Sequence, residues 1–195
     1  MVVLESDEVL QRGDTAPEFE LEGTDGETYT PEDFAEDHSV LLVVFTCNHC
    51  PYAQAKIGTL NDIADDYEEV AVVGVNPNDE EEYPEDSFEE MVAAVEDGEV
   101  DYTAYLRDDL QEAAAAYGAR CTPDPFLFGR KDGEWVLAYH GRLTDATNPD
   151  EEPTEHYGRE AIDTILSGGT VDMEYRPARG CSIKWREGNE PDYVE

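Results

Sequence analysis

The pattern of hydrophobic and polar positions predicts a sheet with helices packed on it. The run VLLVVF at residues 40–45 and the run VAVVGV at residues 70–75 are continuous and rich in β-branched residues, as in strands buried on both faces. Between them, residues 51–68 place apolar side chains on one helical stripe. A strand, a helix and a strand at this spacing predict a right-handed βαβ unit with parallel strands.

The second half of the chain predicts further strands and helices. The polar turn Lys131-Asp132-Gly133 separates the apolar runs PFLF and WVLAY, which indicates an antiparallel hairpin. Asp109 and Glu112 are expected to cap a short helix that Gly118 ends. The other expected elements are a strand at 102–106 and a last helix that ends at Gly168. Together these elements predict an α/β fold, a three-layer sandwich with a central mixed sheet.

The chain of 195 residues fits one domain with additions. We expect the domain to cover residues 1–169, with an N-terminal β extension and an inserted helix at 87–97 that begins with a capping box of Ser87 and Glu90. The stretch DEEEYPED before this helix could bind a cation, but a solvated acidic loop explains it better. Residues 170–195 show no clear period and are expected to be a tail packed on the domain or trailing from it.

Acidic residues outnumber basic ones by 49 to 12, which gives a formal net charge of -37. The acids are spread along the sequence, and only three lysines occur. Such a surface suits concentrated salt, where at about 1 M the Debye length falls to roughly 3 Å and self-repulsion is screened. We therefore expect an origin in the cytosol of a halophile. Nucleic acid is excluded as an expected partner, because this field repels phosphate.

Several features favour a cytoplasmic protein without a membrane partner. No apolar segment approaches the roughly 20 residues that span a bilayer. The start MVVLESDEVLQRGD is acidic and does not resemble a signal peptide. Four cysteines are too few for a disulfide scaffold. In a reducing compartment, a close pair of cysteines is more typical of catalysis or metal binding than of a structural disulfide.

Cys47 and Cys50 form a Cys-x-x-Cys pair where the strand at 40–45 enters the next helix. A helix N-terminus favours a thiolate, so we expect Cys47 to have a lowered pKa and to be the nucleophile. Cys50, one turn on, would resolve the mixed disulfide. Pro51 suits the first helical turn. His49, if protonated, would stabilise the Cys47 thiolate further.

Two other interpretations of the pair remain open. Cys47, His49 and Cys50 could ligate a metal, but zinc requires four ligands, and Cys121 would be the fourth only if the fold delivers it. The two cysteines could also be buried and without a role. Redox chemistry is the favoured interpretation, and neither a metal nor a cofactor is expected.

Three motifs carry a resemblance to a known superfamily. They are GDTAPEFELEGTDGETY at 13–29, the Cys-x-x-Cys stretch, and YGARCTPDPFLFGRKDGE at 117–134. In this order they resemble the thioredoxin-like superfamily, specifically its redoxin branch of AhpC/TSA-type proteins, over roughly residues 13–168. With TCNHCPY, CTPD and GCSIKW, the chain is similar to a peroxiredoxin-like group of this branch whose function is poorly defined.

The resemblance implies a thioredoxin-like fold and a thiol–disulfide oxidoreductase. Pro123 matches the family's cis-proline, which lies against the Cys-x-x-Cys pair and helps to hold the substrate backbone, with Thr122 beside it. Expected partners are protein or small-molecule disulfides or thiols and a reducing thioredoxin or reductase system. A histidine before the second cysteine resembles strong disulfide oxidants, which predicts a reduction potential above thioredoxin's value of about −270 mV.

The sequence also departs from its relatives. A peroxiredoxin motif aligned on Cys50 puts Cys47 at the threonine position, Val43 at the proline position and Pro123 near the arginine position. This argues against a dedicated peroxidase, although a thiol peroxidase remains the alternative, and a non-catalytic metal-binding or redox-sensing module is a further one. Leu41 occupies the position of thioredoxin's buried aspartate, so the proton-transfer role would fall to His49 or a water.

The remaining two cysteines are candidates for additional redox roles. Cys121, two residues before Pro123, is either a small core residue or a third redox cysteine. Cys181, in the tail, could pair with Cys121 or act as an extra resolving thiol.

Overall fold

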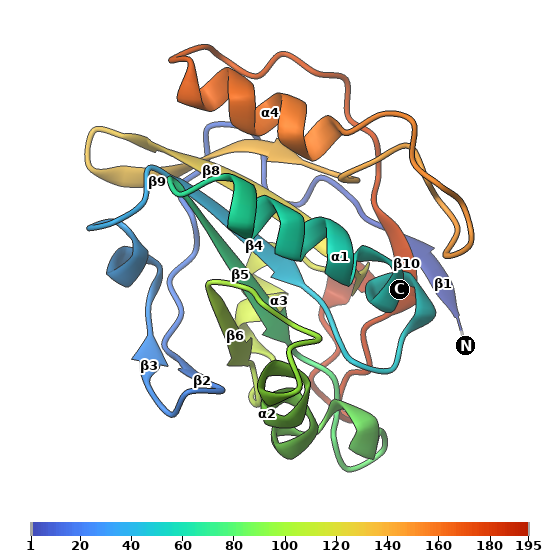
Figure 1. The fold of residues 1–195 in the computed structure, drawn as a ribbon. Coiled ribbons are helices and arrows are strands. Elements are labelled where there is room, and N and C mark those ends of the chain that lie inside the picture. Colours follow the sequence, from blue (N-terminus) through green and yellow to red (C-terminus); the bar gives the residue numbers. More distant parts are fainter. Residues whose placement is uncertain (1, 195) are drawn as a thin grey trace.

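A computed structural model describes residues 2–194 (Figure 1). Its strands are β1 (Val3–Glu5), β2 (Leu21–Gly23), β3 (Thr28–Tyr29), β4 (Val40–Phe45), β5 (Val70–Asn76), β6 (Ala104–Arg107), β7 (Cys121–Thr122), β8 (Asp124–Lys131), β9 (Glu134–His140) and β10 (Arg179–Ser182). Its α-helices are α1 (Pro51–Asp66), α2 (Phe88–Glu96), α3 (Glu112–Tyr117) and α4 (Tyr157–Leu166). Short 3₁₀ helices cover Pro31–Phe34, Pro84–Asp86 and Asp192–Val194. Within residues 2–194, no helix combines the length and the apolar character that crossing a membrane requires.

The main sheet has seven strands in the order β3-β2-β6-β5-β4-β8-β9. Strands β4, β5 and β6 are parallel neighbours, whereas β8 pairs antiparallel with β4 and β9. The predicted βαβ unit is β4-α1-β5, with all six residues of β4 and all seven of β5 buried. The predicted central mixed sheet is therefore confirmed.

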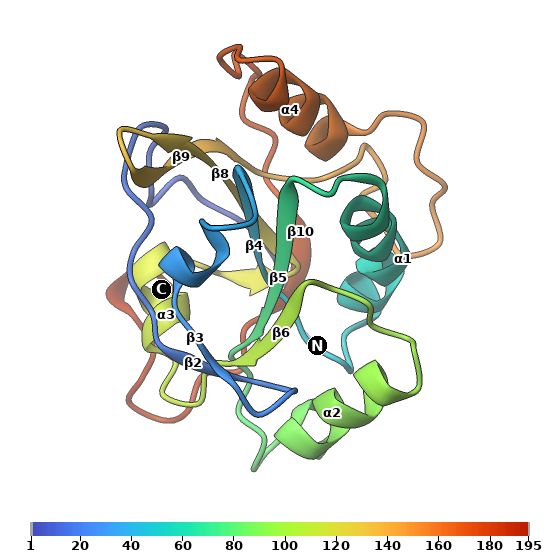
Figure 2. The ribbon, with the colours of Figure 1, turned by 60° about the vertical axis from the view of Figure 1, so that its left-hand side comes forward.

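Helices cover both faces of this sheet, so the predicted three-layer sandwich is confirmed as well. Side chains of a strand alternate between its two faces. Residues 40, 42 and 44 of β4 pack with α1 and α4, and residues 41, 43 and 45 pack with α3. Figure 2 shows α1 and α3 on opposite sides of the strands. Leu41, at the position of thioredoxin's buried aspartate, belongs to the α3-side core.

Turn and cap residues account for several element boundaries. Asp132 and Gly133 both have positive φ, 52° and 85°, as the predicted β8–β9 hairpin requires. The Ser87 hydroxyl accepts a hydrogen bond from the Glu90 amide and caps α2, which is the predicted inserted helix and half of its capping box. Helix α3 begins at Glu112, later than expected, because Gln111 before it has a φ of 61° and is not helical. The carboxylate of Asp108, not that of Asp109, accepts the amides of its first turn.

The C-terminal segment forms a strand that the sequence pattern did not predict. Strand β10 lies between β1 and β7 in a three-stranded antiparallel sheet, with Cys181 opposite Thr122. The Ile183 amide continues the contact by donating to the Arg120 carbonyl oxygen. The C-terminal segment is thereby held against the end of β4 where α1 begins, and the domain division at residue 169 stays a prediction.

Candidate functional site

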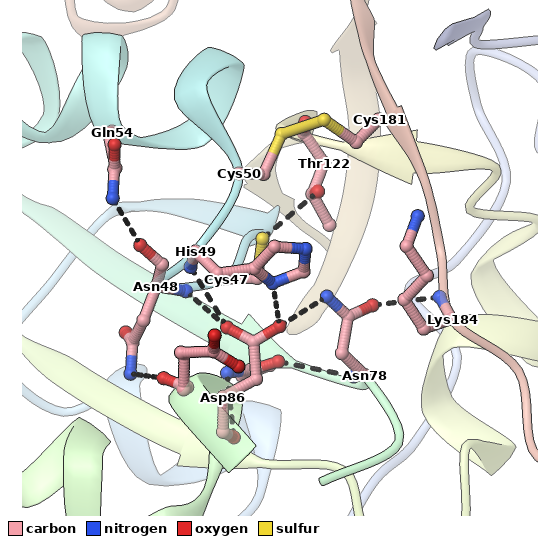
Figure 3. Close-up of polar contacts among 12 residues, drawn as sticks. Cys47, Asn48, His49, Cys50, Gln54, Asn78, Asp86, Thr122, Cys181 and Lys184 are labelled. Atoms are coloured by element: carbon pink, nitrogen blue, oxygen red, sulfur yellow. Dashed lines mark hydrogen bonds and ion pairs between the residues drawn. A yellow bond between two sulfur atoms is a disulfide. The ribbon is translucent and has the colours of Figure 1, made fainter. Parts of the chain in front are cut away.

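The turn between β7 and β8 brings the candidate site together. The Thr122–Pro123 peptide bond is cis, as the resemblance predicts. The Cys47 sulfur lies 3.3 Å from the Thr122 hydroxyl, and the Cys50 sulfur lies 3.5 Å from the Thr122 carbonyl oxygen. Figure 3 shows both cysteines converging on this turn. The structure therefore assembles Cys47, Cys50, Thr122 and Pro123, which the sequence placed in one site.

Cys50 forms a disulfide with Cys181, across 131 residues of sequence (Figure 3). The Cα atoms of these cysteines are 6.3 Å apart, and the thiols of Cys47 and Cys121 are free. The expected Cys47–Cys50 disulfide and the suggested Cys121–Cys181 pair are both absent from the described chain. The reason is β10, whose pairing with β7 presents Cys181 to the first turn of α1.

Gly180 allows β10 to approach β7 this closely. A Cβ atom at this position would lie only 2.0 Å from the Thr122 carbonyl oxygen and 3.0 Å from the Pro123 nitrogen. Any larger residue would therefore push β10 away from the cis-proline turn. The glycine thus sets the distance at which its neighbour Cys181 meets Cys50.

Cys47 has the opposite ionisation behaviour from the one expected. Helix α1 begins at Pro51 with Cys50 as its N-cap, so Cys47 precedes the helix and is only 2% exposed. Burial, followed by the negative charge of Asp86, raises the pKa of Cys47 to about 12. The Thr122 hydroxyl, the Cys50 amide and the Lys184 ammonium lower it by less. The predicted lowered pKa is therefore wrong for the structure with the Cys50–Cys181 disulfide.

His49 is paired with a carboxylate. Its Nδ1 lies 2.5 Å from Oδ2 of Asp86, and its ring stacks on Tyr83 with centroids 5.0 Å apart. The side chain thus lies beside Cys47 as expected, but its ring nitrogen contacts the carboxylate of Asp86 (Figure 3).

Asp86 is the residue of this site that the sequence analysis missed. It is fully buried, and its carboxylate also accepts hydrogen bonds from the amides of Asn48 and His49 and from the Asn78 side chain. The prediction of a solvated loop over DEEEYPED is wrong at this residue. No signal in the sequence distinguishes Asp86 from the exposed acids beside it.

The predicted set of metal ligands is not assembled, but a different set is. Cys50 is bonded to Cys181, and Cys121 is buried with its sulfur near the carbonyl oxygens of Pro123 and Ala178. One ligand atom each from Cys47, His49 and Asp86 lies within 4.8 Å of the other two. The donors are suitable for zinc with one further ligand, although the carboxylate is already saturated with hydrogen bonds.

Burial dominates the environment of Cys121. The thiol is fully buried, and its pKa is raised well above the ordinary value, first by burial and then by the charge of Asp124. These properties favour the interpretation of Cys121 as a small core residue over that of a third redox cysteine.

Residues 12–141 match the AhpC/TSA family, and this range is more than half of the chain. The chain belongs to the AhpC/TSA family. It is similar over 95% of its length to an uncharacterized conserved protein from Geobacillus kaustophilus, at 36% identity and a TM-score of 0.86 over 97% of that chain. A hypothetical protein from Sinorhizobium meliloti 1021 is likewise 36% identical, with a TM-score of 0.85 and coverage of 94% of this chain and 99% of the other.

More distant solved structures show that this AhpC/TSA protein has a thioredoxin-like fold. Peroxidoxin BcpB from Mycobacterium tuberculosis is 16% identical, with a TM-score of 0.60 over 81% of this chain and 97% of its own. No curated protein matches the sequence. Membership of this redoxin family implies thiol-based redox chemistry, with thiols or disulfides as substrates. The expected halophilic origin is not supported by these relatives and stays a prediction.

Proposed function

We propose that this AhpC/TSA protein is a thiol–disulfide oxidoreductase that uses the Cys47–Cys50 pair, with Cys181 as a third exchanging thiol. The observation that carries the proposal is the bond from Cys50 to a cysteine on a strand paired with β7, beside the free thiol of Cys47. Cys47, Cys50 and Cys181 belong to one buried cluster. Cys50 thus has two neighbouring thiols with which it can form a disulfide.

Exchange of the Cys50 disulfide from Cys181 to Cys47 needs no external oxidant or reductant. The Cys47 thiolate attacks the Cys50 sulfur, the Cys47–Cys50 bond forms, and the Cys50–Cys181 bond breaks. Cys181 leaves as a thiolate and takes up a proton. The reverse step regenerates the disulfide seen in the structure.

The exchange with a substrate starts from the reduced protein. Cys47 attacks a substrate disulfide, and one substrate sulfur leaves as a thiol. Cys50 then attacks the mixed disulfide, so the substrate gains two electrons and the protein becomes the Cys47–Cys50 disulfide. Thr122 and Pro123 would hold the substrate backbone, because β7 offers a strand edge there once β10 has moved away. A reducing thioredoxin or reductase system would regenerate the dithiol.

The His49–Asp86 pair is the group best suited to move the proton. Cys47 must lose its proton to react, and a buried thiol with a pKa of about 12 holds it tightly. A histidine hydrogen-bonded to a buried carboxylate is a common proton acceptor. Its ligand atom lies within 4.8 Å of the Cys47 sulfur. Opening of the tail would hydrate Cys47 and lower its pKa toward the ordinary value.

Insulin reduction tests the proposal. The wild-type protein should reduce insulin with a chemical dithiol as donor, and the Cys47→Ser variant should not. The Cys121→Ser variant is the matched control and should retain the wild-type rate. Insulin reduction by Cys47→Ser at the wild-type rate would refute the assignment of Cys47 as nucleophile.

A thiol peroxidase is the second candidate, because one observation favours it. Cys50 stands at the peroxidatic position of the family motif and is bonded to a distant cysteine, as a resolving thiol would be. Peroxide would oxidise the Cys50 thiolate to a sulfenic acid, and Cys181 would condense with it and release water. Among residues 2–194, however, no arginine donates a hydrogen bond to either sulfur. Rapid consumption of peroxide by the reduced protein, lost in Cys50→Ser, would favour this candidate over the oxidoreductase.

A further inference from the structure

A small hollow beside the cis-proline turn has an unusual charge. Nine residues form its wall, among them Pro123 of the turn and Lys56, Arg142 and Arg179. Three of these nine residues are cationic, and none is acidic. In a chain with 12 basic and 49 acidic residues, this composition is the reverse of the average surface. The hollow is therefore a positive site in a strongly negative protein.

The three cations of this hollow have no carboxylate partners. Within residues 2–194, every ion pair of 4.0 Å or less between a carboxylate and a lysine or arginine involves one of five other arginines. Lys56 donates instead to the Thr144 hydroxyl at 2.8 Å and to the Ala146 carbonyl oxygen at 3.3 Å. Arg142 donates to the Pro177 carbonyl oxygen at 3.1 Å. Their positive charge is thus left available to a ligand.

The two acids whose charges act on Lys56 form their hydrogen bonds elsewhere. Asp145 accepts hydrogen bonds from the amides of Thr154 and Glu155 and from the Thr154 hydroxyl. Glu151 accepts the amides and side chains of residues 147 and 148. Both carboxylates therefore stabilise the loop that follows β9. Burial lowers the pKa of Lys56 more than these two acids raise it, so an anion in the hollow would stabilise the lysine's charge.

The hollow adjoins the redox cysteines. Arg179 and Cys181 are two residues apart on β10, so their side chains project from the same face of the strand, about 7 Å apart along it. On the other wall, Pro123 follows Thr122, whose carbonyl oxygen is 3.5 Å from the Cys50 sulfur. A small molecule with an anionic group in the hollow would therefore hold its sulfur beside the cluster that contains both Cys47, which attacks it, and Cys50.

We infer that this hollow binds the carboxylate of a small thiol or disulfide and so selects anionic low-molecular-weight substrates for the exchange. The inference rests on the proposed function for its chemistry, and it adds the substrate class. A local cationic site is needed for such a substrate, because the net charge of -37 repels anions from the rest of the surface.

Calorimetric binding of S-methylglutathione, whose carboxylates are intact and whose sulfur is blocked, tests the site without turnover. We expect S-methylglutathione to bind wild type, and to bind Lys56→Met and Arg142→Gln about tenfold more weakly. Lys56→Arg keeps the positive charge and should bind as wild type does. Lys131→Met is the matched control, because Lys131 is exposed at the far end of β8 and its loss changes the net charge equally. No binding to wild type, or equal weakening by Lys131→Met, overturns the inference.

Steady-state exchange with oxidised glutathione and with uncharged hydroxyethyl disulfide separates this inference from the proposed function. The ratio of the two KM values should shift about tenfold in Lys56→Met and stay unchanged in Lys131→Met. Exchange of both disulfides with similar KM values by wild type overturns the inference and leaves the oxidoreductase intact. Binding of S-methylglutathione without exchange of either disulfide supports the site and overturns the oxidoreductase.

Discussion

The sulfur of Cys50 is bonded to that of Cys181, and this bond joins the N-cap of α1 to the C-terminal strand β10. The bond holds β10 on β7, at the strand edge beside the cis-proline turn. Cys47 stays a buried thiol in the same cluster. This cluster therefore contains one disulfide and one free thiol, and β10 occupies the edge of β7 that the proposed function assigns to a peptide substrate.

Reduction of the Cys50–Cys181 disulfide should destabilise the protein. The bond closes a loop across 131 residues, and a disulfide of this kind typically adds about 2–4 kcal/mol to the free energy of unfolding. Urea unfolding with and without a reductant should therefore show a loss of this size. The Cys181→Ser variant is the control, since its stability should not respond to the reductant in the same way. Equal stability of wild type in both conditions contradicts the assigned bond.

Gly180→Ala should weaken the docking of the C-terminal strand. Its Cβ would meet the Thr122 carbonyl oxygen at 2.0 Å, so β10 must shift at a cost of about 1–3 kcal/mol. Peptide mapping in a redox buffer should then find less Cys50–Cys181 disulfide than in wild type. Gly58→Ala is the matched control, because nothing lies within 4 Å of a Cβ there. An unchanged fraction of the disulfide in Gly180→Ala counts against the tight approach of β10.

Much of the fold could be predicted because its signals are local. The run at 40–45 is buried on both faces and forms the central strand, and the Asp132-Gly133 pair forms the expected turn. Pro51 begins α1 as its fixed φ allows. Each of these features depends on a few neighbouring residues.

The unpredicted parts depend on contacts between distant segments. The four-residue strand β10 has no period of its own and forms because β1 and β7 flank it. The Cys50–Cys181 bond follows from that placement, and the high pKa of Cys47 follows from the burial of its sulfur. Asp86 is one acid in an acidic run, and only the folded chain separates it from its exposed neighbours.

Cys47 should stay protonated at neutral pH in the oxidised protein. With a pKa of about 12, only about one molecule in 10⁴ carries the thiolate at pH 8. The Cβ chemical shift of ¹³C-labelled cysteine, recorded against pH, would measure this ionisation. Because the folded value exceeds the ordinary 9.0, the thiol's contribution to stability is present below pH 9 and is lost as the pH rises toward 12. A midpoint below pH 9 in the oxidised protein contradicts the closed site.

Asp86→Asn should lower both the stability and the pKa of Cys47. The buried carboxylate has four hydrogen bonds, two of them with the amide and the ring of His49, and the side-chain amide of asparagine cannot accept all of them. A loss of about 1–3 kcal/mol in the free energy of unfolding is expected. The pKa of Cys47 falls because the negative charge that raises it is removed. Glu85→Gln is the control, since Glu85 is exposed, and an equal effect in both variants refutes the role of Asp86.

The central claim, that Cys50 exchanges between Cys47 and Cys181, is tested most directly by a redox-buffer titration read by thiol alkylation and peptide mass. We predict two interconverting disulfides, Cys47–Cys50 and Cys50–Cys181, with a midpoint potential above about −270 mV. A Cys50–Cys181 disulfide as the sole product, with Cys47 alkylated as a free thiol at every potential, would contradict the claim and make the bond structural.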